Sequence, residues 1–235
     1  MADVQRVLVG CPTNALKEYC LQEYVEVLKK LSHRPLDALL VDNSSDMRYM
    51  QKLLDLGIPT IKGPSEGSAM ERIVASRNLL REKAIEMKYD WLLMLEQDVI
   101  PPADVIEKLL EHKKSVVTAV YFSRHPKVGK DLIPMVFKPV PTDRDGFPDM
   151  RVLNHDEIFM GPRLQQVVSA GLGCVLIHRS VFEKVPFRTE SNDSFDDYWF
   201  FSDVYKLDIP VFVDSKLRCK HLIQNKPFLW GFEKK

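Results

Sequence analysis

The sequence predicts an α/β fold in which a mostly parallel central sheet is flanked by helices. In residues 1–115, short and nearly continuous apolar runs alternate with helical patterns. Such runs are typical of strands that helical crossovers bury on both faces. The chain has 235 residues, 45% of them hydrophobic and 28% charged, and no repeat or clear linker divides it. We therefore predict one globular domain with a sizeable core, spanning residues 1–235.

The predicted elements of the first half follow one another as strand and helix. In residues 16–31, apolar residues recur about one turn apart, which gives a helix with one buried face. A short helix carries Met50 and Leu53, and Ser45 or Asp46 is expected to cap it. The predicted strands are residues 6–11, 36–42, 58–63 and 91–97, and the other helices are residues 68–87 and a segment after Pro102.

The second half is predicted to be more elaborate. Residues 115–122 form a strand pattern, and residues 123–161 are rich in proline and charged residues, which predicts a functional excursion or a flap. A strand bearing glycines then leads into a helix within residues 167–185. Residues 196–207 have a helical pattern, and residues 209–222 are expected to form the last two strands.

Composition limits the classes of ligand and the setting. Lys and Arg together number 33, as do Asp and Glu, so no overall field attracts nucleic acid, and a charged ligand must be held locally. No window has the length of a membrane span, and the first residues do not resemble a signal peptide, which predicts a cytoplasmic protein. The four cysteines form no CxxC pair, so we expect reduced thiols and no zinc site.

The residues that follow the predicted strands are candidates for ligand binding. Open parallel sheets bind ligands at the carboxyl ends of their strands. Asp42 or Asn43 can accept a hydrogen bond from a nucleobase or a ribose, or can close the loop as an Asx turn. The sequence has neither GxGxxG nor a P-loop motif, which argues against dinucleotide oxidoreductases and P-loop enzymes. The candidates are Pro12, Thr13, Asn14, Asp42, Asn43, Glu96 and Asp98.

Glu96 and Asp98 form an acidic pair at the end of the strongest apolar run. Two carboxylates one residue apart on an extended strand face the same side, so they can share a Mg²⁺ or Mn²⁺ ion that keeps positions open for phosphate oxygens. The alternative is a solvated turn in which Asp98 or Asp104 caps the next helix.

Two further segments carry titratable groups. Asp196 and Asp197 begin a helix rich in aromatic residues, and an ionised carboxylate there can serve as a general base. The alternative is that Asp196 only caps this helix while the aromatic residues form core. His221 ends a late strand and is structural unless acids meet it in space.

Together, these segments resemble the GT-A glycosyltransferases, most closely the inverting family 2 enzymes. The family's VDDGSxD, Ala-Arg-Asn and DxD motifs are matched by VDNSSD, ASRN and EQD. Its GG…LIRRSVFEKVGGFD segment is matched by AGLGCVLIHRSVFEKVPF, its ED helix by DDYWFF, and its terminal D…H by VDSKLRCKH. The order holds over residues 5–221. The resemblance implies a GT-A Rossmann-like fold with a nucleotide-binding half, residues 1–115, and an acceptor-binding and catalytic half, residues 116–235.

The resemblance also implies a role for each matching residue. Asp98 and His221 would bind Mn²⁺ or Mg²⁺, and Glu96 would contact the metal or the ribose. Asp197 would be the catalytic base that deprotonates an acceptor hydroxyl, so that the sugar of a nucleotide-diphosphate donor is transferred with inversion. The residues implied to meet the nucleobase, ribose and diphosphate are Pro12, Thr13, Asn14, Asp42, Asn43, Arg77, Glu96 and Gln97.

Two other functions remain open from the sequence. A nucleotidyltransferase on a similar sheet would carry a basic, glycine-rich loop after the first strand, where only Lys17 is found. A protein that binds nucleotide sugars without turnover is the second. The acceptor would be a hydroxyl of a glycan, a lipid-linked molecule or a protein. The C-terminal Phe228, Leu229, Trp230 and Phe232 are expected to pack on the core, with a lid or contact at the inner face of a membrane as alternatives.

Overall fold

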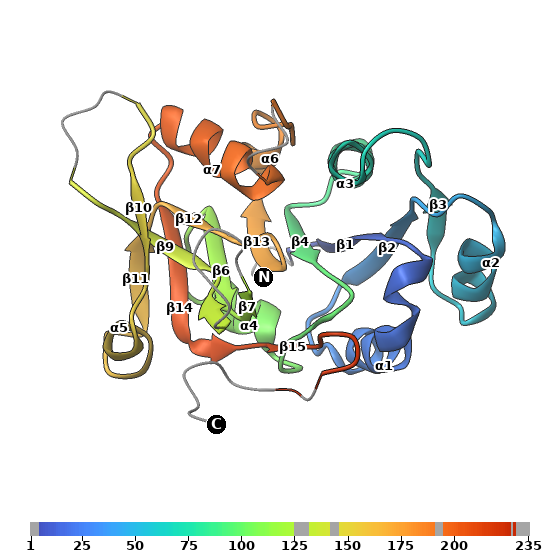
Figure 1. Cartoon of the computed structure of the whole chain (residues 1–235), viewed down its shortest axis with the longest axis horizontal. Coiled ribbons are helices and arrows are strands. Elements are labelled where there is room, and N and C mark those ends of the chain that lie inside the picture. Colours follow the sequence, from blue (N-terminus) through green and yellow to red (C-terminus); the bar gives the residue numbers. More distant parts are fainter. Residues whose placement is uncertain (1–4, 125–131, 142–145, 191–194, 227, 229–235) are drawn as a thin grey trace.

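In the computed structural model of the chain, the described residues are 5–124, 132–141, 146–190, 195–226 and 228, and the arrangement of the elements is shown in Figure 1. An eight-stranded sheet has the order β11-β14-β6-β13-β4-β1-β2-β3. It takes strands from both halves of the chain. Strands β13 and β11 run opposite to the other six, so the predicted α/β fold with a mostly parallel central sheet is confirmed.

The first half forms the parallel part of this sheet. The helical segment predicted for residues 16–31 begins as a 3-10 helix, η1 (Ala15–Cys20), and continues as an α-helix. Asp46 accepts the Arg48 N–H at 2.9 Å, so Asp46 supports the start of α2. The strands are β1 (Val7–Thr13), β2 (Leu36–Asp42), β3 (Thr60–Lys62) and β4 (Trp91–Leu95), and the helices are α1 (Leu21–Lys30), α2 (Arg48–Asp55), α3 (Ala69–Glu86) and α4 (Val105–Leu110).

The second half adds four strands to the sheet and a small layer beside it. The four are β6 (Val116–Val120), β11 (Leu164–Val167), β13 (Cys174–His178) and β14 (Val211–Arg218), and the helices are α5 (His155–Phe159), α6 (Arg179–Phe182) and α7 (Asp196–Lys206). The described parts of the predicted excursion form helix α5 and short strands. These strands are β7 (Phe122–Arg124), β8 (Leu132–Pro134), β9 (Val136–Pro139) and β10 (Met150–Val152), and β9 also pairs with β12 (Ser169–Ala170).

The glycine-bearing strand predicted within residues 167–185 is divided by its glycines into β12 and β13. The side chain of Tyr121 packs directly against the backbone of Gly171 and Gly173. A Cβ atom added at Gly171 would lie 2.0 Å from the Tyr121 hydroxyl, and one added at Gly173 would lie 2.7 Å from the Tyr121 ring. Side chains at these positions would clash, so the backbone passes close to the ring. The last predicted strands are β14 and β15 (Lys220–His221), and β15 pairs with β5 (Val99–Ile100).

Two apolar cores cover the two faces of the sheet. Leu92 and Met94 of β4 join the core under α3 and α7, and Leu93 and Leu95 join the core under α1 and α4. Figure 1 shows α3, α6 and α7 on one side of the sheet, with α1 and α4 on the other. Strand β4 is therefore buried on both faces, as its apolar sequence predicts.

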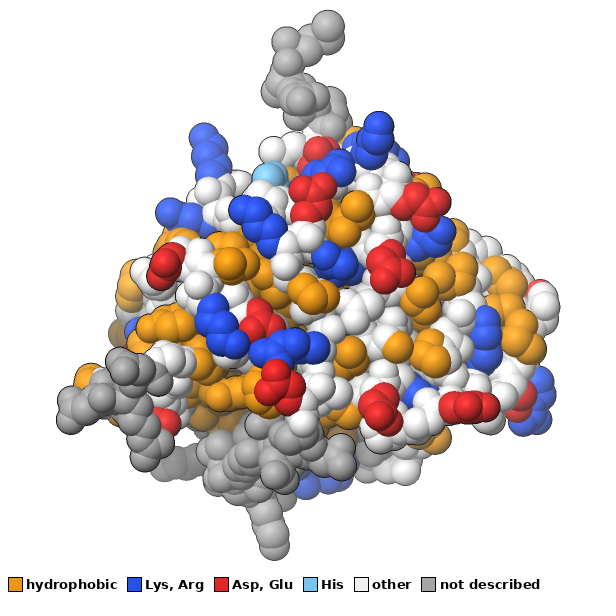
Figure 2. All heavy atoms as spheres, turned by 90° about the horizontal axis from the view of Figure 1, so that it is seen from above, with side chains coloured by type: hydrophobic (Ala, Val, Ile, Leu, Met, Phe, Trp, Pro, Cys, Tyr) orange, Lys and Arg blue, Asp and Glu red, His pale blue; other side chains and the backbone are white. Residues whose placement is uncertain are grey.

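The outer surface carries mixed charges. On the face seen in Figure 2, Lys, Arg, Asp and Glu side chains are interspersed with hydrophobic ones. Among the described residues, no helix is long and apolar enough to cross a membrane. The C-terminal residues for which packing or membrane contact is predicted, apart from Phe228, lie outside the described part of the chain.

Candidate active site

The candidate residues gather where β1, β2 and β4 end. Strand β1 pairs in parallel with both β2 and β4, which brings Thr13 opposite Asp42 and near the segment after Leu95. That segment is a turn, because β4 stops at Leu95 and the Val99 N–H bonds to the Glu96 carbonyl at 2.9 Å. The premise that Glu96 and Asp98 lie on one extended strand is therefore wrong, and the two carboxylates have different partners, Arg77 for Glu96 and Lys17 for Asp98.

Asp98 is the centre of a buried polar cluster. Its Oδ2 accepts hydrogen bonds from Lys17 Nζ and from the Tyr19 hydroxyl at 3.3 Å, and it lies 3.3 Å from His221 Nε2. Burial raises the pKa of Asp98, but the His221 hydrogen bond and the Lys17 charge outweigh burial and hold it well below its ordinary value. Its Oδ1 is buried and has no partner among the described residues. Asp98 is therefore an ionised carboxylate with one oxygen unused. The turn places it where it does not cap α4, and Asp104 makes no side-chain cap either.

His221 is oriented by its other ring nitrogen. Its Nδ1 lies 2.8 Å from the Phe122 carbonyl oxygen and must donate there, since a carbonyl only accepts. Its Nε2 then faces Asp98 either as an N–H of the imidazolium or as a lone pair. Burial lowers the pKa of His221, but Asp98 more than offsets this and raises it. His221 thus meets an acid in space, which is the condition for more than a structural role, and the charged form fits this contact.

A divalent ion does not fit these side chains as they are arranged. Asp98 and His221 lie together, but Lys17 holds Asp98 Oδ2, and Glu96 Oε1 accepts Arg77 Nη2 at 2.7 Å. Within the described ranges, no group of three or more His, Cys, Asp or Glu could hold a metal ion. The Mn²⁺ or Mg²⁺ site at Glu96, Asp98 and His221 therefore stays a prediction.

Arg77 joins three elements at the same end of the sheet. It projects from α3, is 2% exposed, and donates to Asp196 Oδ2 of α7 at 2.6 Å as well as to Glu96. Burial lowers its pKa, but the two carboxylates outweigh burial and keep it charged. Its Nη1 is buried and has no partner among the described residues. Asp196 therefore pairs with Arg77 instead of capping α7, whose N-cap residue is Phe195.

Asp197 follows Asp196 and is surrounded differently. Its Oδ1 accepts the Tyr198 N–H at 2.7 Å, and the side chain is partly buried. Burial and the negative charge of Asp196 raise the pKa of Asp197 to about 7, although Arg77 opposes the rise. The position at a helix start predicts an ordinary ionised acid, but burial outweighs the helix dipole. Asp197 is thus poised to gain or lose a proton near neutral pH.

Asp42 and Asn43 are committed to the protein itself. Asp42 is fully buried, and its Oδ1 accepts the Ser44 N–H at 3.0 Å, closing the Asx turn that was the alternative reading. Its Oδ2 accepts from Lys62 Nζ at 3.2 Å, and Asn43 Nδ2 donates to Ser76 at 3.2 Å. Their role toward a nucleobase stays a prediction.

Three other predicted residues support the 3-10 helix η1. Gln97 is 1% exposed, donates to the Lys17 carbonyl at 2.8 Å, and accepts from Thr13 Oγ1. Asn14 is the N-cap of η1 and accepts the Leu16 N–H at 2.8 Å. Their neighbour Pro12 lies within β1 opposite Val41. Gln97 and Asn14 thus hold Lys17 in place, and the contacts of Pro12, Thr13, Asn14 and Gln97 with a ligand stay predictions.

The sequence reading missed Lys17, Tyr19 and Tyr121 as members of the site. Tyr121 is buried, and its ring meets His221 edge-on with ring centroids 5.5 Å apart. The two glycines of AGLGC gave a signal for a ring packed on backbone. Lys17 and Tyr19 gave none, because they fall in the helical pattern of residues 16–31, which predicts only a buried apolar face.

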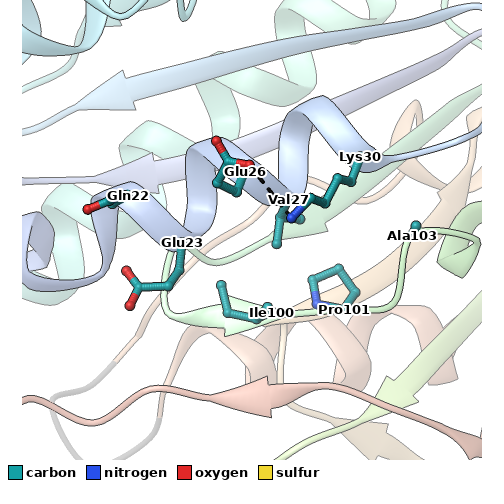
Figure 3. A pocket seen from close by; sticks show the side chains of 8 residues that line it. All are labelled: Gln22, Glu23, Glu26, Val27, Lys30, Ile100, Pro101 and Ala103. Carbon is teal, nitrogen blue, oxygen red and sulfur yellow. Dashed lines mark ion pairs between the residues drawn. The ribbon is translucent and has the colours of Figure 1, made fainter.

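A groove of about 510 Å³ lies elsewhere, between α1 and the segment after β5 (Figure 3). Glu26 and Lys30, paired at 3.6 Å, lie on its helical wall. The lining is Gln22, Glu23, Glu26, Val27, Lys30, Ile100, Pro101 and Ala103. None of these is a predicted site residue, so this groove is not the site described above.

Comparison with solved structures decides the fold. The sequence matches no protein-family model and no curated protein. A197 from STIV superposes with a TM-score of 0.57 at 17% identity, over 96% of this chain and 90% of that one. S. aureus TarS 1-349 gives 0.55 at 15% identity, over 95% of this chain. CMP:2-keto-3-deoxy-manno-octonic acid synthetase complexed with CTP gives 0.53 at 12%, over 89% of both chains. This chain has a GT-A-like fold.

The GT-A-like fold gives the Asp98 cluster and the Arg77 pairs a shared location. Both lie just past the carboxyl end of β4, the edge at which open parallel sheets bind ligands. TarS 1-349 has also been solved with UDP and with UDP-GlcNAc. The chain spans 59% of TarS 1-349.

Proposed function

We propose that this chain is a glycosyltransferase that moves a sugar from a nucleotide-diphosphate sugar to an acceptor hydroxyl, with inversion. Asp197, with a pKa of about 7, carries the proposal, because it stands beside the Arg77 pairs at the ligand-binding edge of the sheet. The TarS complexes with UDP and UDP-GlcNAc support a nucleotide-sugar donor on this fold.

The proposed reaction is one displacement at the anomeric carbon. The acceptor oxygen forms the new bond to that carbon as its proton passes to Asp197. The bond from carbon to the diphosphate oxygen breaks, and the nucleoside diphosphate leaves with the electron pair. A base with a pKa near the working pH is effective in this step. The cation that is exposed enough to meet the departing diphosphate is Lys17, whereas Arg77 is buried and paired with Glu96 and Asp196.

The test separates donor binding from transfer. A thermal-shift screen of UDP-, GDP- and CDP-sugars, with and without Mn²⁺, identifies a donor through stabilisation of the folded state. Asp197→Asn should keep donor binding and lose sugar transfer and donor hydrolysis by about 100-fold or more. Asp203→Asn, which removes a carboxylate of α7 paired with Arg188, is the matched control and should retain activity. If Asp197→Asn transfers sugar at the wild-type rate, Asp197 is not the base. If no nucleotide sugar stabilises the protein in the screen, the proposed function is wrong.

A nucleotidyltransferase is the second candidate. The similarity to CMP:2-keto-3-deoxy-manno-octonic acid synthetase favours it. That reaction joins a nucleotide to a sugar and releases pyrophosphate, whereas glycosyl transfer releases a nucleoside diphosphate. Assaying both products with nucleoside triphosphates and with nucleotide sugars distinguishes the two enzymes.

A further inference from the structure

Lys17 holds the carboxylate oxygen of Asp98 that also faces Tyr19 and His221, so it competes with any divalent cation for that oxygen. Its ammonium group donates to Asp98 Oδ2, and the two side chains are 33% and 6% exposed, respectively. Tyr19 and His221 approach the same oxygen at 3.3 Å. Asp98 therefore already faces a fixed positive charge on a side chain that solvent, and hence a ligand, can reach.

The fold places Lys17 through its backbone. The Lys17 N–H donates to the Asn14 carbonyl at 2.9 Å, and its own carbonyl accepts Gln97 Nε2 at 2.8 Å. Gln97 is the residue before Asp98, so one turn presents the carboxylate and also anchors the helix that carries the lysine. This buried support distinguishes the pair from a surface ion pair, whose geometry is held only by the two side chains.

The neighbouring charges leave little for a divalent ion to bind. Hard cations such as Mg²⁺ and Mn²⁺ rely on carboxylate oxygens. Glu96 is paired with Arg77, which also holds Asp196, while Asp98 is paired with Lys17. An ion at Asp98 Oδ2 would have to displace the ammonium group and then lie beside it.

We propose that the Lys17 ammonium is the resident cation of this site and binds the diphosphate of the nucleotide ligand without a divalent metal. The ligand's identity rests on the proposed function. An ammonium group has three N–H donors, and the bond to Asp98 leaves two for phosphate oxygens. Asp98 then acts as the positioning residue that orients the lysine.

UDP binding measured by calorimetry, in EDTA and in Mn²⁺, tests this. Wild type should bind UDP with the same affinity in both. Lys17→Met should lose about tenfold or more in EDTA, the effect expected for a charge-assisted hydrogen bond, and Mn²⁺ should restore binding. Lys52→Met is the matched control, since Lys52 pairs with Glu18 of the same 3-10 helix away from Asp98, and it should behave as wild type. Wild-type binding that disappears in EDTA, or Lys17→Met binding equal to wild type there, would overturn the proposal.

A measurement without nucleotide tests the role of Lys17 independently of the proposed glycosyltransferase function. Electron paramagnetic resonance of Mn²⁺ alone should show tighter binding to Lys17→Met than to wild type, because Asp98 Oδ2 loses its ammonium partner and becomes available beside His221. Equal Mn²⁺ binding by both would contradict the inference. If no nucleotide binds any variant, the proposed function fails, yet this comparison still decides whether Lys17 excludes the ion. Lys17→Gln, which removes the charge but keeps a donor, replaces Lys17→Met if the latter fails to fold.

Discussion

Replacing Arg77 with methionine removes the guanidinium group that joins Glu96 to Asp196. Both carboxylates stay near the end of β4 but lose their cation, and the Asp196 side chain is only 10% exposed. Removing one partner of a buried ion pair costs about 3–5 kcal/mol. Glu96 is 29% exposed and can be rehydrated, so we assign the cost mainly to Asp196 and expect about 3 kcal/mol.

Urea unfolding measures this cost, and a double-mutant cycle identifies its source. Because Asp196 would be left as an unpaired carboxylate, Arg77→Met in an Asp196→Asn background should cost much less than in wild type. Arg77→Lys is the conservative control, which keeps the charge but loses the fork that reaches both acids. A loss below about 1 kcal/mol for Arg77→Met, or an equal loss in both backgrounds, would refute this reasoning.

Two further predictions follow from the site and its surroundings. The pKa of Asp197 is raised to about 7 from an ordinary 3.8, so the protonated form contributes stability that is fully present below about pH 4 and is lost as the pH rises through about 7. The rate of sugar transfer should rise over the upper part of that range, because the base must be deprotonated to act. The urea unfolding of Asp197→Asn should lack this pH dependence. A transfer rate that is flat from pH 5 to 9 would contradict the assignment of Asp197 as the base. Gly171→Ala should destabilise the fold by about 1–3 kcal/mol, since its Cβ would lie 2.0 Å from the Tyr121 hydroxyl. Tyr121→Phe should recover part of that loss in thermal unfolding, whereas recovery by an unrelated change such as Tyr205→Phe would point to another cause.

The sequence predicted the sheet well and the site only in part. The apolar run of β4 is buried on both faces and fixes the centre of the sheet, so the strands around it were assigned correctly. Where β4 ends could not be predicted, because the turn at Glu96–Asp98 is closed by a backbone hydrogen bond rather than by a glycine or proline. Because β4 ends two residues earlier than the sequence predicts, Glu96 and Asp98 lie in a turn and pair with different cations, Arg77 and Lys17.

The roles of individual polar residues are harder to predict from the sequence than the strands are. Gln97, Asn14 and Asp42 have the chemistry of ligand-binding groups, but each of them forms a hydrogen bond with a backbone group of the protein. Which use prevails depends on burial, and burial is set by tertiary packing that the local sequence does not encode. Lys17 shows the reverse case, a residue of an ordinary helical pattern that η1 carries into the centre of the site.

The Asp98 cluster draws on the beginning, the middle and the end of the chain. The contact between Asp98 and His221 joins residues 123 positions apart, and Tyr19 bonds to the Leu222 carbonyl across 203 positions. During synthesis, the first half of the sheet can therefore form while Asp98 still lacks His221. The site becomes complete only when β15 pairs with β5. A protease cut just before Lys220 would therefore leave all eight strands of the central sheet uncut but would detach His221 from the chain that carries Asp98.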